Sequence, residues 1–125
     1  MRELLFVGVG GFFGACARYL ATSAVLRVSA ASPVPLATLS VNVVGCALIG
    51  VAVGLADGRG LLAGETRLLA VVGFLGGFTT YSSFGLEAFE LLRRGAIATV
   101  AAYIGAHLLF GIGAVAAGYA LGRSV

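Results

Sequence analysis

Four apolar stretches, each as long as a membrane-spanning helix, make up most of the chain. They cover residues 4–26, 36–56, 68–92 and 96–121, with short polar breaks between them. Each has the roughly 20 residues needed to cross about 30 Å of hydrocarbon. The runs are long and lack the alternation of polar and apolar residues that barrel strands show. The sequence therefore predicts an all-α membrane protein with four transmembrane helices in a single domain, 1–125.

The composition excludes other broad classes of protein. Hydrophobic residues make up 60% of the chain, charged residues make up 10%, and the mean hydropathy is +1.09. A soluble domain of this size needs a more charged surface. The arginines are spread along the chain and form no basic run, so no nucleic-acid binding is expected. One histidine and two cysteines that match no metal motif, Cys16 and Cys46, provide no nucleophile–base set. We expect no enzymatic activity and interpret both cysteines as buried small hydrophobes.

The N-terminal segment has a competing interpretation as a signal peptide. Met1, Arg2 and Glu3 precede an apolar run, as in such peptides. The run continues to about Leu26, which is longer than the apolar part of a signal peptide and long enough to span a bilayer. We therefore expect a retained transmembrane helix.

The arginines are divided almost evenly between the two sides of the predicted bundle. Four helices place both termini on one side, which holds Arg2, Arg59, Arg67 and Arg123; the other side holds Arg27, Arg93 and Arg94, with Arg18 in the last turns of the first helix. Orientation normally follows an excess of positive residues on the cytoplasmic side. That excess is nearly absent here, which favours insertion in both orientations and an antiparallel dimer. A weak bias set by another feature is the alternative.

Glycines four residues apart occur in all four apolar stretches. The pairs are Gly10/Gly14, Gly50/Gly54, Gly73/Gly77 and Gly118/Gly122. Such pairs let helix backbones approach closely in membranes. They predict a tightly packed bundle that includes a subunit interface, and a four-helix unit this small is expected to form an oligomer.

Carboxylates are missing from the middle of the predicted spans. Glu3 lies at the very start of the first helix, and Glu87 and Glu90 lie toward the end of the third. A proton-coupled cation exporter needs a buried carboxylate, and the four-helix multidrug exporters carry a glutamate in the middle of their first helix. A small multidrug exporter is therefore a disfavoured alternative, alongside a purely structural membrane subunit.

Hydrogen-bond donors are concentrated on two helix faces. Thr38 and Asn42 are four residues apart in the second stretch, and Tyr103 and His107 are four apart in the fourth, so each pair shares a face. Polar groups inside a membrane are candidate functional groups because they are costly there. Donors without acids suit a small anion. The alternatives are an interhelical hydrogen bond for Asn42 and a packing role for His107.

The third stretch contains G-G-F-T-T-Y-S-S-F at 76–84, which is poor helix-forming sequence. Glycine costs about 1 kcal/mol in a helix and threonine is stiff, so we expect a break near the middle of the membrane. Carbonyls freed by a break can hold a cation. After the break, Tyr81 and Phe84 share a face, and the positive edges of their rings can attract an anion. A kinked helix with packed aromatic rings is the alternative.

Three ordered motifs resemble the Fluc (CrcB) family of fluoride channels. They are G-G-F-F-G-A-C-A-R-Y (10–19), A-T-L-S-V-N-V-V-G (37–45) and G-F-L-G-G-F-T-T-Y-S-S-F (73–84), and the resemblance covers essentially the whole chain. It implies an antiparallel, dual-topology homodimer in the cell membrane, with paired pores that pass fluoride passively and reject chloride. It also implies a structural sodium ion on the two-fold axis, held by the backbone carbonyls of Gly76 and Thr79 from each subunit.

The resemblance also implies which residues line the fluoride pore. The two pore phenylalanines of the family correspond to Tyr81 and Phe84, and the further matching positions are Asn42, Ser82, Ser83 and Tyr103. Thr38 and His107 join this set because they share faces with Asn42 and Tyr103. Arg18 matches the arginine of the G-A-x-x-R-Y motif near the vestibule, where it would draw anions in.

The chain departs from the usual T-T-F-S-T-F pattern of the family. Tyr81 replaces the first phenylalanine and Ser83 replaces a threonine. These changes leave open a paired-gene heterodimer, although the balanced arginines argue against one. His107 lies where the family usually has hydroxyl or small residues, and its protonated form would favour an anion. We therefore expect at most a modest pH dependence of conduction.

Overall fold

The computed structural model describes all 125 residues and is entirely helical. Three of the spans are single helices: α1 (Arg2–Ser29), α2 (Leu36–Arg59) and α6 (Ile97–Ser124). The third span consists of α3 (Gly64–Arg67), the π-helix η1 (Leu68–Leu75), α4 (Gly76–Phe78) and α5 (Tyr81–Arg93). All four spans are long and apolar enough to cross a membrane, and we describe the chain as a multi-pass membrane protein.

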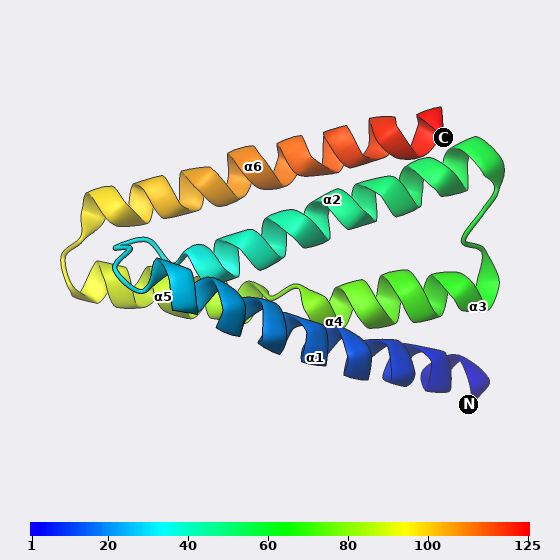
Figure 1. The fold of residues 1–125 in the computed structure, drawn as a ribbon, viewed down its shortest axis with the longest axis horizontal. Coiled ribbons are helices and arrows are strands. Elements are labelled where there is room, and N and C mark those ends of the chain that lie inside the picture. The colour runs from blue at the N-terminus through cyan, green and yellow to red at the C-terminus, as the bar shows by residue number, and fades with distance from the viewer.

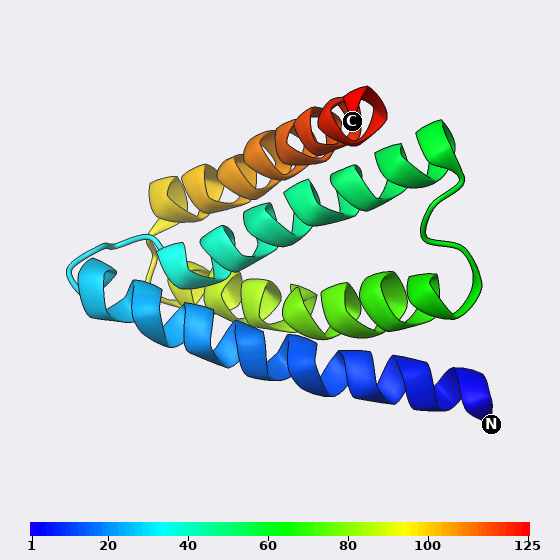
Figure 2. The ribbon, with the colours of Figure 1, turned by 45° about the vertical axis from the view of Figure 1, so that its right-hand side comes forward.

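The spans form two closely packed pairs. Successive spans run in opposite directions, and both termini lie at the same end of the bundle (Figure 1). α2 packs along α6, whereas α1 packs on η1 and α4 (Figure 2). α5 contacts α6 and α2 but does not contact α1. The second half of the third span therefore belongs to the α2–α6 side of the molecule.

Prolines and glycines set the ends of the helices. Pro35 directly precedes α2, where its missing N–H is no loss. Gly60 caps the end of α2, and Gly95 lies in the turn between α5 and α6. Their φ angles of 66° and 72° are in the left-handed region that favours glycine. The connections between spans are consequently short and well defined.

Glycine lets the helix backbones touch within each closely packed pair of spans. A methyl group added at Gly118 would overlap the Ala47 carbonyl of α2, and one added at Gly10 would overlap the Leu69 carbonyl of η1. The other members of the four predicted glycine pairs make similar contacts within the chain. The tightly packed bundle is therefore confirmed. These pairs hold helices of the same chain together, and their place in a subunit interface stays a prediction.

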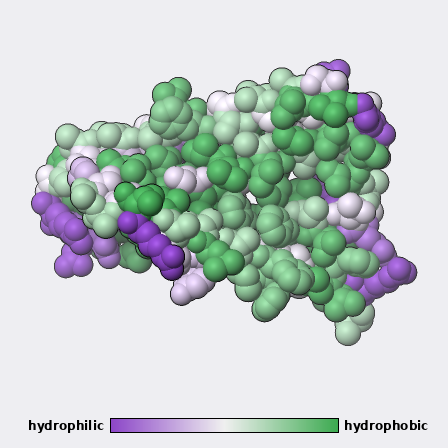
Figure 3. All heavy atoms as spheres, viewed as in Figure 1, coloured by the Kyte–Doolittle hydropathy of each residue, from purple (hydrophilic) through white to green (hydrophobic).

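Most apolar side chains face outward. Only 17 of the 125 residues are buried, and apolar residues cover the middle of the molecule while strongly polar ones gather mainly at its two ends (Figure 3). This is the surface expected of a protein surrounded by lipid. It also explains why Cys16 is exposed and Cys46 half-buried, and not buried as predicted. An apolar segment in a membrane protein can face lipid as well as protein.

The helices extend beyond the predicted apolar stretches. The stretch at 4–26 lies within Arg2–Ser29, and the stretch at 68–92 lies within a span that runs from Gly64 to Arg93. Terminal arginines can belong to membrane helices because their long side chains reach the headgroup level. Since α1 continues to Ser29, Arg18 lies about 16 Å inside its end and not in its last turns as predicted.

Candidate functional site

The third span leaves the helical conformation at Thr79 and Thr80. Their φ and ψ angles are −84° and 159° for Thr79 and −149° and 117° for Thr80, so both are extended. The Thr80 hydroxyl accepts the N–H of Ser83 at 3.3 Å and thereby caps the first turn of α5. The T-T pair therefore both ends α4 and starts α5.

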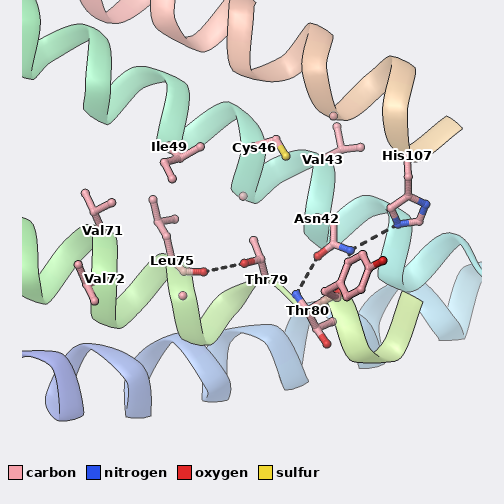
Figure 4. A pocket seen from close by; sticks show the side chains of 14 residues that line it. Asn42, Val43, Cys46, Ile49, Val71, Val72, Leu75, Thr79, Thr80 and His107 are labelled. Carbon is pink, nitrogen blue, oxygen red and sulfur yellow. Dashed lines mark hydrogen bonds between the residues drawn. The ribbon is translucent and has the colours of Figure 1, made fainter. Parts of the chain in front are cut away.

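Asn42 of α2 forms hydrogen bonds with the backbone of the extended segment Thr79–Thr80, which we call the interruption. Its Oδ1 accepts the N–H of Thr80 at 2.9 Å, and its Nδ2 donates to the carbonyl of Thr80 at 3.0 Å (Figure 4). In a continuous helix the Thr80 N–H would donate to the Gly76 carbonyl, which here loses that helical partner. An interhelical hydrogen bond, the alternative considered for Asn42, is thus present in the structure.

An unexpected carboxylate lies beside this site. Half-buried Glu87 of α5 accepts hydrogen bonds from the Thr38 hydroxyl, at 2.7 Å, and from the Tyr103 hydroxyl. The description of the donors as free of acids is therefore wrong. Glu87 follows Phe84 by three residues and so points to the same side, toward α2 and α6. That spacing is the signal that could have placed it opposite Thr38 and Tyr103.

Three rings form an aromatic cluster between α5 and α6. The Phe84 ring centroid is 5.4 Å from that of Tyr103 and 4.4 Å from that of His107. The Tyr103 and His107 rings are 4.5 Å apart and nearly perpendicular. Tyr103 is fully buried, whereas Tyr81, 5.6 Å from Phe84, is 83% exposed. The predicted aromatic pair thus has one member inside the bundle and one on its surface.

His107 connects this cluster to Asn42. Its Nδ1 lies 3.1 Å from the carbonyl oxygen of Tyr103, and its Nε2 lies 3.4 Å from Nδ2 of Asn42. Both predicted donor faces, that of α2 and that of α6, therefore meet at the interruption.

The remaining predicted residues are placed differently. The Ser83 hydroxyl is 3.1 Å from that of Thr80, and the exposed Ser82 hydroxyl is 3.3 Å from it, so both belong to the cap of α5. Arg18 lies apart from the cluster on α1, a helix that does not contact α5 or α6. It is half-buried and makes no hydrogen bond or ion pair.

An open groove of about 480 Å³ runs along the interruption. Its lining includes Asn42 and His107 at one end and Ile49 and Val71 at the other (Figure 4), and Gly76 also lines it. No cluster of three or more histidine, cysteine or acidic side chains can hold a metal ion in this structure.

Comparison with known proteins identifies the family. The model of the CrcB-like protein family, described as Camphor Resistance (CrcB), matches residues 5–119. The chain belongs to the CrcB-like family. The resemblance seen in the three sequence motifs is thereby confirmed.

Relatives of this CrcB-like chain match it over nearly their full length. It is 45% identical over 125 residues to an Agrobacterium fabrum protein named "Fluoride-specific ion channel FluC", covering 100% of this chain and 99% of the relative. A protein of the same name from Methylobacillus flagellatus is 41% identical over 112 residues, or 90% and 88% of the two chains. Another, from Prosthecochloris aestuarii, is 45% identical over 120 residues, or 96% and 92%.

Proposed function

We propose that this chain is the subunit of a fluoride-selective channel that passively exports fluoride across the cell membrane. The observation that carries the proposal is its full-length similarity to proteins named as fluoride-specific ion channels. Fluoride enters cells as neutral HF and dissociates at the higher internal pH, so a passive pore lowers its cytoplasmic concentration. The chain acts as a channel and not as an enzyme.

The functional unit is an antiparallel homodimer. The groove exposes Gly76 and lies beside the extended Thr79–Thr80 segment. Lipid cannot satisfy backbone polar groups, and irregular backbone inside a membrane needs protein or water around it. A second copy covering the groove meets that need, and the nearly even division of arginines allows the two copies to insert in opposite orientations.

The interruption lies in the middle of the membrane and provides a structural sodium site. Unwound backbone carbonyls coordinate Na⁺ in other membrane proteins. The Gly76 carbonyl suits this role because its helical donor, the Thr80 N–H, is bonded to Asn42. Gly76 and Thr79 from each subunit would supply the oxygens, and the bound ion would hold the two interruptions together.

The pore runs past the aromatic rings and hydroxyls near the start of α5. Phe84 and Tyr81 present ring edges, which carry partial positive charge and attract an anion without binding it tightly. Ser82 and Ser83 add hydroxyl donors, and Arg18 at the vestibule raises the local anion concentration. Asn42 keeps the interruption in place for this path.

The departures at Tyr81 and Ser83 leave a paired heterodimer as the alternative assembly. Heterodimer partners should each carry a clear bias in arginine placement, and this chain does not. We therefore favour the homodimer, in which each copy supplies the same pore residues.

Fluoride efflux from liposomes that contain the purified protein tests the proposed function. Rapid efflux of fluoride without chloride is expected, and Phe84→Ile should abolish it because Phe84 contacts both Tyr81 and the α6 rings. Phe89→Ile is the matched control, since Phe89 is an exposed phenylalanine of the same helix. Equal passage of chloride, or no fluoride efflux from a folded homodimer, would contradict the proposal.

A further inference from the structure

The Thr80 backbone determines the orientation of the Asn42 amide. A backbone N–H can only donate a hydrogen bond, and a backbone carbonyl can only accept one. The Thr80 N–H lies 2.9 Å from Oδ1 and the Thr80 carbonyl lies 3.0 Å from Nδ2 of Asn42. Turning the amide over would place donor against donor and acceptor against acceptor. Nδ2 is therefore the atom that faces His107.

The same reasoning determines which ring nitrogen of His107 carries the proton. Nε2 lies 3.4 Å from a donor, the Asn42 Nδ2, and must accept. Nδ1 lies 3.1 Å from an acceptor, the Tyr103 carbonyl, and must carry a hydrogen. Only the neutral ring protonated on Nδ1 satisfies both contacts. A continuous hydrogen-bond chain then joins the Tyr103 carbonyl, through His107 and Asn42, to Thr80.

The surroundings hold the His107 ring without providing another partner for Nε2. Phe84 and Tyr103 pack against the ring with centroids 4.4 Å and 4.5 Å away. The titratable groups nearby are Cys46 of α2 and Tyr81 of α5, which line the same groove, and Glu87 of α5, which is bonded to Tyr103. No arginine lines the groove, and α1 does not contact α6.

We propose that His107 is a positioning residue that orients Asn42 on the interruption and makes this support sensitive to pH. The proposal rests on the proposed function, since the supported segment borders the pore. The neutral ring accepts the Asn42 proton that is not bonded to Thr80. Asn42 is thereby held from three directions, and its amide stays aligned with Thr80.

Protonation of His107 removes this support. Nε2 then carries a hydrogen and faces the Nδ2 hydrogens of Asn42, and Thr80 prevents the amide from turning. Donor meets donor, so the two side chains must separate and the interruption loses one of its supports. Fluoride flux should therefore fall as His107 gains a proton. A ring that acted only by attracting anions would produce the opposite change.

The proton position can be measured directly because the chain has one histidine. Nitrogen-15 NMR of the histidine-labelled protein should show a protonated Nδ1 and an unprotonated Nε2 at neutral pH, although free imidazole side chains favour the opposite form. The backbone amide signal of Thr80 should shift in His107→Leu and stay in place in Leu109→Ala, a lipid-facing control on the same helix. A proton on Nε2, or an unmoved Thr80 signal in His107→Leu, would overturn the proposal.

Efflux measurements provide the functional test. His107→Gln keeps an acceptor that cannot be protonated, and His107→Leu removes the acceptor. Near pH 8, His107→Gln should retain most of the flux, while His107→Leu should lose about fivefold, the scale of one hydrogen bond. As the pH is lowered until the nitrogen-15 signals show that His107 is protonated, flux through the wild type should fall and flux through His107→Gln should stay flat. The HF leak of protein-free liposomes is subtracted at each pH.

Three outcomes separate the possibilities. A rise of wild-type flux at low pH would overturn the positioning role in favour of direct anion attraction by the charged ring. Wild-type flux from His107→Leu would overturn it as well. If the wild type itself passes no fluoride, the proposed function fails, whereas the NMR measurement still decides whether His107 supports Asn42.

Discussion

At the scale of single residues, the polar groups of the site are largely bonded to one another. Asn42 is bonded to Thr80 and His107, and the hydroxyls of Thr38 and Tyr103 both donate to Glu87. A donor that looks free in the sequence therefore has an internal acceptor in the fold. These bonds join α2, α5 and α6 where no glycine contact holds α5.

Two tyrosine-to-phenylalanine changes separate an internal hydroxyl from a surface one. Tyr103→Phe removes a donor from Glu87 in a fully buried position and should lower the free energy of unfolding by about 2 kcal/mol. Tyr81→Phe removes an exposed hydroxyl without a hydrogen bond and should change it by less than about 0.5 kcal/mol. Denaturation of the detergent-solubilised protein, followed by circular dichroism, measures both. Equal losses of stability in the two variants would show that the hydrogen bond from Tyr103 to Glu87 does not stabilise the fold.

Among the helical elements, the two halves of the third span pack against different helices. Its first half, η1 and α4, touches α1 through Gly73 and Gly77, while its second half packs on α6. The two halves therefore belong to different helix pairs, and the extended Thr79–Thr80 segment lets the chain pass from one to the other. The π-helix η1 comes before this extended segment, and π-helical turns are frequent at functional sites.

The contact between α2 and α6 should depend on glycine only at the touching positions. Gly118→Ala would overlap the Ala47 carbonyl and should destabilise the protein by about 1–3 kcal/mol. Gly113→Ala, on the same helix, meets nothing within 4 Å and should be neutral or stabilising, because alanine is the better helix former. Thermal unfolding of the two variants compares them. A comparable loss of stability in both variants would mean that the close contact between α2 and α6 does not determine the effect of the substitution.

For the molecule taken as a whole, the apolar surface is indented by a groove that exposes Gly76 and lies beside the extended Thr79–Thr80 segment. The Gly76 carbonyl at this groove has lost its helical donor, because the Thr80 N–H is bonded to Asn42, and lipid offers no replacement. The glycine pairs contact other helices of the same chain, and the proposed dimer therefore predicts that a second copy covers this groove.

A side chain at Gly76 should fit the subunit and block the dimer. A methyl group there meets nothing within 4 Å in one chain. Gly76→Val should therefore fold but give the mass of a single 12.5 kDa chain in detergent by light scattering, whereas the wild type should give twice that mass. Gly113→Val, on the face of α6 opposite the groove-lining Gly111, should remain dimeric. A dimeric Gly76→Val protein would place the interface elsewhere.

Sodium should stabilise the assembled dimer. An ion that binds only the folded dimer raises its stability as concentration increases, by about 1.4 kcal/mol for each tenfold increase above the dissociation constant. Unfolding temperatures measured in sodium chloride and in potassium chloride at equal ionic strength should therefore diverge. Identical temperatures in both salts would argue against a sodium site at Gly76 and Thr79.

The class of the protein and the position of its interruption follow from the order of its residues along the chain. Four long apolar runs allow only membrane helices, since backbone groups cannot be left unpaired in lipid. The T-T pair marks the segment where the structure leaves the helix, because glycine and threonine are poor helix formers. The shared faces of Thr38 with Asn42 and of Tyr103 with His107 also followed from helical spacing alone.

The partners that those residues contact depend on how the helices pack. Helical spacing shows which side chains share a face, but it does not show which face of another helix lies opposite. The pairing of α2 with α6 and the turn of α5 bring Glu87 to Thr38 and Tyr103, and bring Asn42 to Thr80 and His107. The same packing leaves Arg18 away from this cluster. Packing brings together residues that are distant in the chain. These contacts determine which donors are hydrogen-bonded within the protein and which are not.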